Sequence, residues 1–201
     1  QRNFAGKATN NFVVNGIADM GIIQVDNATG GSFIVNGTVR TAHPNGLEPG
    51  TSSIAGGNLV IRPGSTIHYN CNCDQAVTSS NRIDPTMAAE DTVYRHVRFS
   101  NGGIKTVSVL TQVKDSVTIN DPTTVVNAMT ANLGMSGANI TKLTMTAGLF
   151  RLGTSGTEPL MDGLYQISGG TVEFGYDGIT PQNIKGGNTH LYQNIIVTGN
   201  S

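Results

Sequence analysis

A strand–turn–strand pattern that occurs twice, roughly 100 residues apart, constrains the fold of this chain more than any other feature. The first copy covers residues 64–101 and the second covers residues 169–199. Each copy has a first strand in which apolar and polar residues alternate, a turn-rich segment that contains Gln, and a second strand that opens on Tyr. A repeat of this kind indicates a fold built by stacking copies of one structural unit.

Short strands joined by few turn residues are compatible with the hairpins of a β-sandwich or with the windings of a solenoid. Like residues stack over like residues along a solenoid, so a solenoid explains the repeat, whereas a sandwich does not require it. Ile67 and Val172 are expected to point into the core, and His68 and Glu173, at the same step of the two copies, are expected to face solvent. We therefore predict an all-β parallel β-helix of about eight or nine coils, with about 20 to 25 residues in each coil.

The composition does not shift anywhere along the chain in a way that would divide it, so we predict a single β-helix domain over residues 1–201. Both ends of the chain read as the middle of such a domain, and Gln1 does not begin a signal peptide, so we expect a processed chain or a segment of a longer surface protein. The first copy of the repeat is nine residues longer than the second between its Gln and its Tyr. Because insertions at the corner of a repeat usually project from one face, the sequence predicts a polar loop insertion near 71–92.

Charged residues make up 12% of the chain, against about 25% in ordinary soluble domains, and 26 residues are Gly. This composition suits short strands joined by Gly and Asn turns. The net charge of −1 at pH 7 gives no electrostatic reason to expect nucleic acid or an anionic membrane as a partner. No apolar run approaches the ~18 residues of a spanning helix, so we expect no membrane insertion.

Cys71 and Cys73 are the only cysteines, and one residue separates them. They are either two free thiols or an unusual local disulfide, since a bridge over this spacing is expected to be strained. A metal site can be assembled on paper from these cysteines with His68 and Asp74, but zinc sites normally combine ligand pairs that lie far apart in the sequence. We therefore assign no metal-binding and no cofactor-binding residues.

Parallel β-helices include polysaccharide lyases and glycosidases, so enzymatic activity has to be weighed. Sugar hydrolysis needs two carboxylates that face one cleft. The acidic residues of this chain are scattered, and the only adjacent pair, Glu90 and Asp91, lies in the predicted insertion. No Gly-x-Ser-x-Gly motif supports a serine triad. We assign no catalytic residues and expect a protein that is not an enzyme.

A small basic cluster lies in the second strand of the first copy. Because Val97 and Phe99 are expected to point inward, His96 and Arg98 are expected to point outward together. With Arg95 they form a basic step beside the predicted insertion, which suits an acidic glycan or the carboxylates of a protein partner. Arg95, His96 and Arg98 are therefore the candidate surface contacts, and a solvated strand edge is the alternative interpretation.

Three phrases near the C-terminal end resemble repeats of large secreted surface proteins of Bacteroidetes, among them gliding adhesins: Gly170–Phe174, Gln182–Ile184 and Tyr192–Gly199. The segment Phe33–Ala42, followed by Asn45–Leu47, is similar to another recurring phrase of those proteins. The resemblance implies a right-handed parallel β-helix, export through the outer membrane, and a role in adhesion, surface motility or filament-like display.

These observations together predict a non-enzymatic adhesin or structural module that is secreted or held at the cell surface and that forms filaments. Its expected partners are further copies, through head-to-tail or lateral contacts, or a surface glycan. The alternative is an extracellular β-helix that binds or degrades polysaccharide.

Overall fold

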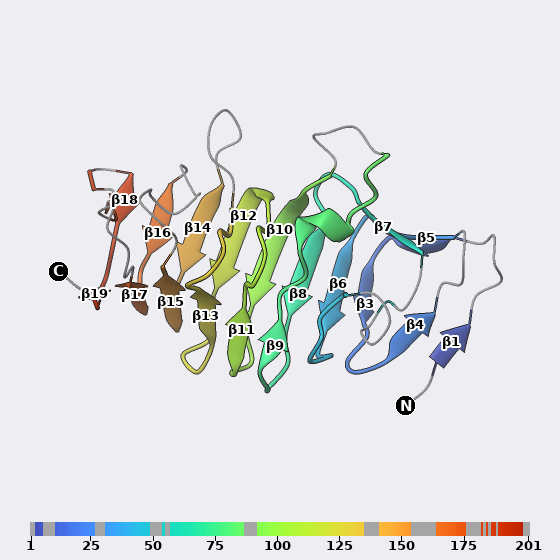
Figure 1. The fold of residues 1–201 in the computed structure, drawn as a ribbon, viewed down its shortest axis with the longest axis horizontal. Helices are drawn as coiled ribbons and strands as arrows, with labels where there is room; N and C mark the ends of the chain where they lie inside the picture. The colour runs from blue at the N-terminus through green and yellow to red at the C-terminus, as the bar shows by residue number, and fades with distance from the viewer. Residues whose placement is uncertain are drawn as a thin grey trace.

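The structure is a computed structural model that describes residues 3–5, 11–26, 31–48, 54, 57–86, 92–134, 141–153, 164–175, 182, 184, 186–187 and 189–198. The named strands pair with one another in parallel throughout this part of the chain. They lie side by side across an elongated body, with β1 and β19 near opposite ends of its long axis (Figure 1). The fold is a parallel β-solenoid, which confirms the predicted class.

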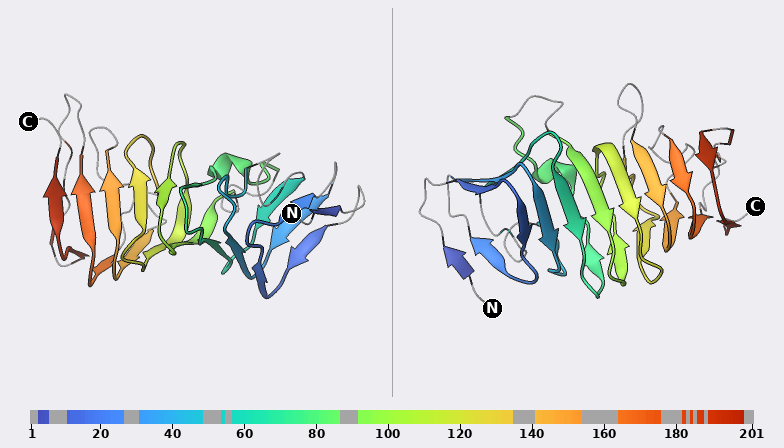
Figure 2. Two further views of the ribbon diagram at one scale, coloured as in Figure 1. Left: turned by 90° about the horizontal axis from the view of Figure 1, so that it is seen from below. Right: turned by 180° about the vertical axis from the view of Figure 1, so that it is seen from behind.

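Two large sheets form the two main faces of the solenoid, and Figure 2 shows them from two further sides. The eight-stranded sheet consists, in spatial order, of β3 (Ile17–Asp19), β6 (Thr38–Thr41), β8 (Thr66–Tyr69), β10 (Tyr94–Phe99), β12 (Val113–Ile119), β14 (Lys142–Met145), β16 (Tyr165–Ile167) and β18 (His190–Leu191). The six-stranded sheet consists of β9 (Gln75–Ala76), β11 (Ile104–Thr106), β13 (Val125–Ala128), β15 (Leu149–Leu152), β17 (Thr171–Phe174) and β19 (Ile195–Val197).

The N-terminal windings use two smaller sheets in place of the six-stranded one. One contains β2 (Phe12–Val14), β5 (Ser32–Val35) and β7 (Asn58–Ile61), and the other contains β1 (Asn3–Ala5) and β4 (Gln24–Asp26). A short 3₁₀ helix, η1 (Ser80–Arg82), follows β9. In the part of the chain that the structure describes, no helix has the length and apolar character needed to cross a membrane.

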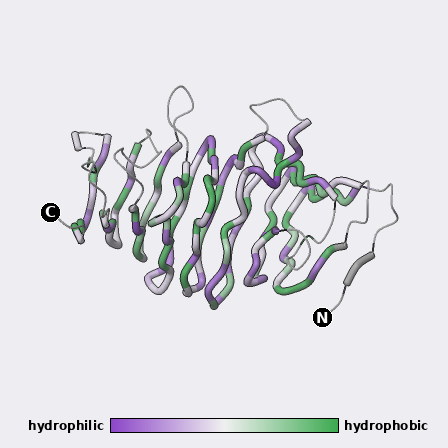
Figure 3. Tube along the Cα trace, in the orientation of Figure 1, coloured by the Kyte–Doolittle hydropathy of each residue, from purple (hydrophilic) through white to green (hydrophobic). Residues whose placement is uncertain are grey.

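Alternation along each strand sorts side chains between the core and the surface. In β14, for example, Leu143 and Met145 are buried, whereas Lys142 is exposed. Because the strands pair in register, the inward residues stack in columns, and they form one hydrophobic cluster that extends from Val14 to Phe174. The same alternation is visible along the chain trace, where hydrophobic and hydrophilic residues take turns (Figure 3). One continuous dry core therefore holds the windings together.

The corner between the two main sheets requires backbone conformations that only a few residues adopt. Between β10 and β11, Asn101, Gly102 and Gly103 all have positive φ angles, of 67°, 74° and 67°. A Cβ atom on Gly103 would lie 2.0 Å from the carbonyl oxygen of Cys73 in the preceding winding. The Asn-Gly-Gly sequence is therefore required by the sharp turn and by the close approach of two windings.

The two copies of the repeat lie on different faces. The first strand of copy one is β8, in the eight-stranded sheet, whereas the first strand of copy two is β17, in the six-stranded sheet. Ile67 and Val172 are both buried, as expected. His68 and Glu173 are also buried, with 8% and 7% of their surface exposed, so the expectation that they face solvent is wrong. His68 lies between neighbouring side chains of its own sheet, and Glu173 accepts hydrogen bonds of 2.8 and 3.1 Å from Arg151.

The solenoid has about six turns that contribute a strand to both main sheets, fewer than the eight or nine coils predicted. The prediction assumed coils of nearly constant length. Paired residues show that the length varies, because Thr66 pairs with His96, 30 residues later, and His96 pairs with Ser116, 20 residues later. Corners of unequal length absorb residues that a constant repeat would have assigned to further coils.

The predicted polar loop insertion near 71–92 is, over its described residues 71–86, part of the solenoid wall, so that prediction is wrong there. It contains β9 and η1, and Val77, Thr78 and Ile83 are buried. The Thr78 hydroxyl accepts a hydrogen bond of 2.7 Å from the backbone N–H of Leu47, which ties the segment to the neighbouring winding. Residues 87–91 lie outside the described part of the chain.

Candidate functional site

An open groove of about 500 Å³ lies on the outer face of the eight-stranded sheet. It crosses five successive strands, from β3 to β12, so its long axis follows the axis of the solenoid. The residues that line it are Ile17, Thr38, Arg40, Gly64, Thr66, His68, His96, Val97, Arg98, Ser116 and Thr118. A polymer laid along this groove would meet side chains from each strand in turn.

In-register pairing arranges the groove residues in two outward columns. The first column contains the hydroxyl side chains together with one imidazole, in the order Ile17, Thr38, Thr66, His96 and Ser116. The second contains most of the charge, in the order Asp19, Arg40, His68, Arg98 and Thr118. Adjacent members of a column are separated by one strand spacing, about 4.8 Å.

His68 lies at the centre of the charged column. Its Nε2 is 2.7 Å from the hydroxyl oxygen of Ser100. Burial lowers the pKa of His68 to about 4, and the positive charges of Arg98 and Arg40 lower the pKa further in the same direction, against a smaller opposing effect of Asp19. The imidazole is therefore neutral at pH 7, between two permanent positive charges.

This arrangement predicts a loss of stability in mild acid. The unfolded chain binds a proton at His68 near its ordinary pKa of 6.5, whereas the folded chain resists protonation until about pH 4. Between about pH 7 and about pH 4.5, the contribution of His68 to the free energy of unfolding should therefore fall by about 2 kcal/mol. Urea unfolding of the protein and of a His68→Gln variant at both pH values checks this, because the difference between the two proteins isolates His68. An unchanged difference would contradict the assigned environment.

The three residues predicted from sequence are placed differently from one another. His96 and Arg98 both line the groove, as their outward direction required. Arg95 does not line it, because a shift of register at Tyr94 turns the Arg95 side chain toward Asp115, to which its Nε donates a hydrogen bond of 2.9 Å. The role of these residues as ligand contacts stays a prediction.

Sequence reasoning missed Arg40 and His68 as members of the site. They lie 28 and 56 residues from one another's partners in the chain only through the winding: Arg40 pairs with His68, and His68 pairs with Arg98. The signal that would have found them is the register between successive coils, which aligns Thr-Val-Arg-Thr in β6 with Thr-Ile-His-Tyr in β8. The repeat over roughly 100 residues concealed this shorter alignment.

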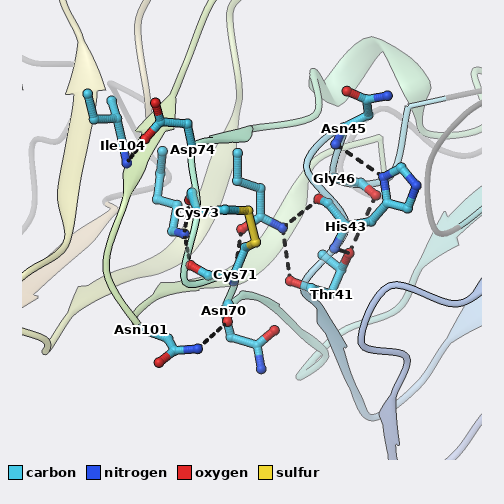
Figure 4. Close-up of a disulfide and its surroundings, with 12 residues drawn as sticks. Thr41, His43, Asn45, Gly46, Asn70, Cys71, Cys73, Asp74, Asn101 and Ile104 are labelled. Carbon is cyan, nitrogen blue, oxygen red and sulfur yellow. Dashed lines mark hydrogen bonds between the residues drawn. A yellow bond between two sulfur atoms is a disulfide. The ribbon is translucent and has the colours of Figure 1, made fainter.

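A polar corner lies inside the solenoid next to the site, and it contains a disulfide between Cys71 and Cys73 (Figure 4). The two sulfurs are therefore neither free thiols nor zinc ligands in this structure. Gln75, which is buried, donates from Nε2 to the carbonyl oxygens of Thr41 and His43, each at 2.9 Å. Its Oε1 accepts a 3.4 Å hydrogen bond from the backbone N–H of Cys71.

Lys105 completes this corner from the next winding. Its side chain is fully buried, and its Nζ donates to the carbonyl oxygens of Cys71 and of Cys73, the latter at 3.2 Å. Burial lowers the pKa of Lys105 to about 8, against the opposing effects of Asp74 and Asp121. The corner thus turns the chain by supplying side-chain donors to carbonyl groups that the strands do not pair.

Among the described residues, no group of three or more His, Cys, Asp or Glu side chains is arranged to hold a metal ion. The carboxylate nearest the charged column, Asp19, is 3.6 Å from Arg40. What the groove offers chemically is a row of hydroxyl, imidazole and guanidinium groups, which can donate hydrogen bonds to oxygen atoms of a ligand.

Comparison with known proteins gives no relative to set beside this geometry: no protein-family model, no curated protein and no solved structure matches the chain. The similarity to Bacteroidetes surface proteins therefore rests on the quoted phrases of the sequence, and the function has to be argued from the groove itself.

Proposed function

We propose that this chain is a non-enzymatic adhesion module, secreted or displayed at a cell surface, that binds an extended polysaccharide along the groove of its eight-stranded sheet. One observation carries the proposal: the groove crosses five strands, and every strand supplies side chains to it at a regular spacing. An extended polymer is a ligand whose repeating units can match repeating windings. A compact small molecule would contact only one or two of them.

The openness of the groove also favours binding over catalysis. Catalysis depends on groups held in a closed, water-poor site, whereas this groove is a surface feature whose walls are side chains of a single sheet. The hydroxyls of Thr38, Thr66 and Thr118 are suited to hydrogen bonds with sugar hydroxyl groups.

Two further considerations support an extracellular location and the predicted winding. The disulfide between Cys71 and Cys73 is the kind of bond that persists in oxidising compartments and is rare in the cytosol. Crossover connections between parallel strands are right-handed in the great majority of proteins, which favours the right-handed coil that the sequence resemblance implies.

The proposal is tested by blocking the groove with a large side chain. Thr66→Trp places an indole in the middle of the groove, on β8. Thr171→Trp is the matched control, because Thr171 is also a partly exposed strand residue, on β17 of the other sheet. Both proteins and the unmodified chain are applied to a panel of immobilised neutral and acidic polysaccharides, and binding is measured by surface plasmon resonance. Thermal unfolding verifies that both variants fold.

We expect the unmodified chain to bind at least one polysaccharide on the panel, Thr66→Trp to weaken that binding at least tenfold, and Thr171→Trp to leave it within about twofold. If no polymer is bound, or if both variants bind as the unmodified chain does, the proposal is wrong. Self-association of the chain in sedimentation, with no polymer bound, would favour the structural role in filaments over the adhesive one.

A further inference from the structure

We propose that the ligand of the groove is an acidic polysaccharide with one anionic group on every second sugar, held by Arg40 and Arg98 across the intervening His68. This inference rests on the proposed function and adds the chemical class of the polymer. It is derived from the partners of the arginine side chains, from their spacing and from the residues between them.

The two groove arginines differ from the two arginines that have structural roles on the outer faces. Arg95 donates from Nε to Asp115 at 2.9 Å, and Arg151 donates to both oxygens of Glu173, at 2.8 and 3.1 Å. Those guanidinium groups already have carboxylate partners at hydrogen-bonding distance. Their charges are therefore satisfied within the fold.

Arg40 and Arg98 lack such partners among the described residues. The nearest carboxylate to Arg40 is that of Asp19, at 3.6 Å, and the Nε of Arg40 is buried without a hydrogen-bond partner. Arg98 is exposed, and its Nε donates only a long bond of 3.4 Å to the neutral amide oxygen of Asn120. A guanidinium group prefers a carboxylate or a related oxyanion in fork geometry, so both side chains are available to an anionic ligand.

Their spacing selects among anionic polymers. Arg40 and Arg98 lie two strands apart in the same column, with His68 on the strand between them, so their Cα atoms are roughly 10 Å apart. A pyranose unit in an extended glycan is about as long as one strand spacing. An alternating disaccharide with one acidic sugar therefore presents its anionic groups at about the interval of the two arginines.

The residue between the arginines fits a neutral sugar. His68 is uncharged at pH 7, and it stands opposite Thr66 and His96, which contribute hydroxyl and imidazole groups to the facing column. These groups form hydrogen bonds with sugar hydroxyls without requiring a charge on the ligand. A polymer with an anion on every sugar would place a charge against an imidazole that the fold keeps neutral.

Charge density also favours a glycan over a nucleic acid. Polynucleotides carry a charge on every nucleotide, and proteins that bind them usually combine many cations with exposed aromatic stacking platforms. The groove has two arginines and is lined by no Phe, Tyr or Trp, and the whole chain has a net charge of −1. A sparse polyanion matches this distribution.

The test compares two polymers that differ only in the acidic group: hyaluronan, with one carboxylate per disaccharide, and carboxyl-reduced hyaluronan, which has none. Affinities are measured by isothermal titration calorimetry for the unmodified chain and for the Arg40→Gln/Arg98→Gln variant. Arg151→Gln is the control, because it removes one positive charge from the opposite sheet, and Thr66→Trp tests the groove itself. Single-stranded oligothymidylate serves as the nucleic-acid probe, and thermal unfolding verifies the fold of each variant.

We expect hyaluronan to bind at least tenfold more tightly than its carboxyl-reduced form, and the double variant to lose that preference while Arg151→Gln keeps it. Added salt should weaken the binding of hyaluronan, because the contacts are exposed charges. Equal binding of both polymers, abolished by Thr66→Trp, would overturn the acidic specificity and leave the proposed function standing. Tighter binding of oligothymidylate would overturn the inference in favour of nucleic acid, and failure to bind any polysaccharide would overturn both proposals.

Discussion

Replacing Phe99 by Ala is expected to lower the free energy of unfolding by about 4 kcal/mol. Phe99 is fully buried, and its ring stacks on that of Tyr69 in the preceding winding, with the ring centroids 5.6 Å apart. On the other side it pairs in register with Ile119. Truncation would remove contacts with two neighbouring windings at once and leave a cavity that the hydrogen-bonded ladder on both sides cannot close. Denaturation in guanidinium chloride measures the change.

The neighbouring residue supplies the control. Arg98 is adjacent in sequence and in the same strand, but its side chain is exposed on the outer face. Arg98→Ala should change the free energy of unfolding by no more than about 0.5 kcal/mol. Similar losses in both variants would mean that β10 does not alternate between core and surface, and the stacked-column description of the core would then be wrong.

Alternation of this kind explains why the fold class could be predicted from the sequence. Strands such as Thr66–Tyr69 and Thr171–Phe174 are short, have β-branched and aromatic residues on one face, and are bounded by Gly, Asn and Pro. Corners such as Asn101-Gly102-Gly103 mark where the chain must change direction. These are local signals, and the structure uses them locally.

The register between windings could not be predicted in the same way. Register depends on the length of each corner, and corner lengths are free to vary, because each winding has to satisfy only its two neighbours. The long-range similarity between the two copies misled the analysis, because it aligned strands that lie in different sheets. It therefore placed His68 and Glu173 at equivalent solvent-facing steps, whereas His68 lies in the groove and Glu173 is held by Arg151.

The candidate site was predictable to the extent that it lies within one strand. The alternation in β10 sufficed to place His96 and Arg98 on the outer face, and both line the groove. Arg40 comes from another winding, so its place beside His68 follows only from the pairing of β6 with β8. The engagement of Arg95 with Asp115 depends on an irregularity of register at the start of β10, for which the sequence has no local signal.

The polar corner shows a further limit of sequence reasoning. Lys105 occupies an inward position, where it pairs with Gln75 on one side and Val126 on the other, and a lysine at such a position contradicts the simple rule for buried residues. The rule fails because the corner at 71–74 turns backbone carbonyl groups inward. Those groups need donors, and a long side chain from the next winding reaches them.

Lys105→Met is therefore expected to be strongly destabilising in a pH-dependent way. The variant leaves the carbonyl groups of Cys71 and Cys73 without this donor, which should cost about 3 kcal/mol at alkaline pH. The pKa of Lys105 is lowered from 10.5 to about 8 in the folded protein, so between these values the unfolded chain binds more protons than the folded one. The stability that Lys105 contributes must then rise with pH, by about 1.5 kcal/mol between about pH 8 and about pH 9.5.

Measuring the difference between the two proteins separates this effect from that of the tyrosines. Burial raises the pKa of Tyr69 and of Tyr94, and a raised phenol pKa lowers stability as pH approaches 10, which opposes the effect of Lys105 in the unmodified protein. Both tyrosines are present in Lys105→Met, so their contribution cancels when urea unfolding is compared at each pH. A difference that stays constant from about pH 8 to about pH 9.5 would show that Lys105 titrates like an exposed lysine, and that its amine does not hold the corner carbonyl groups.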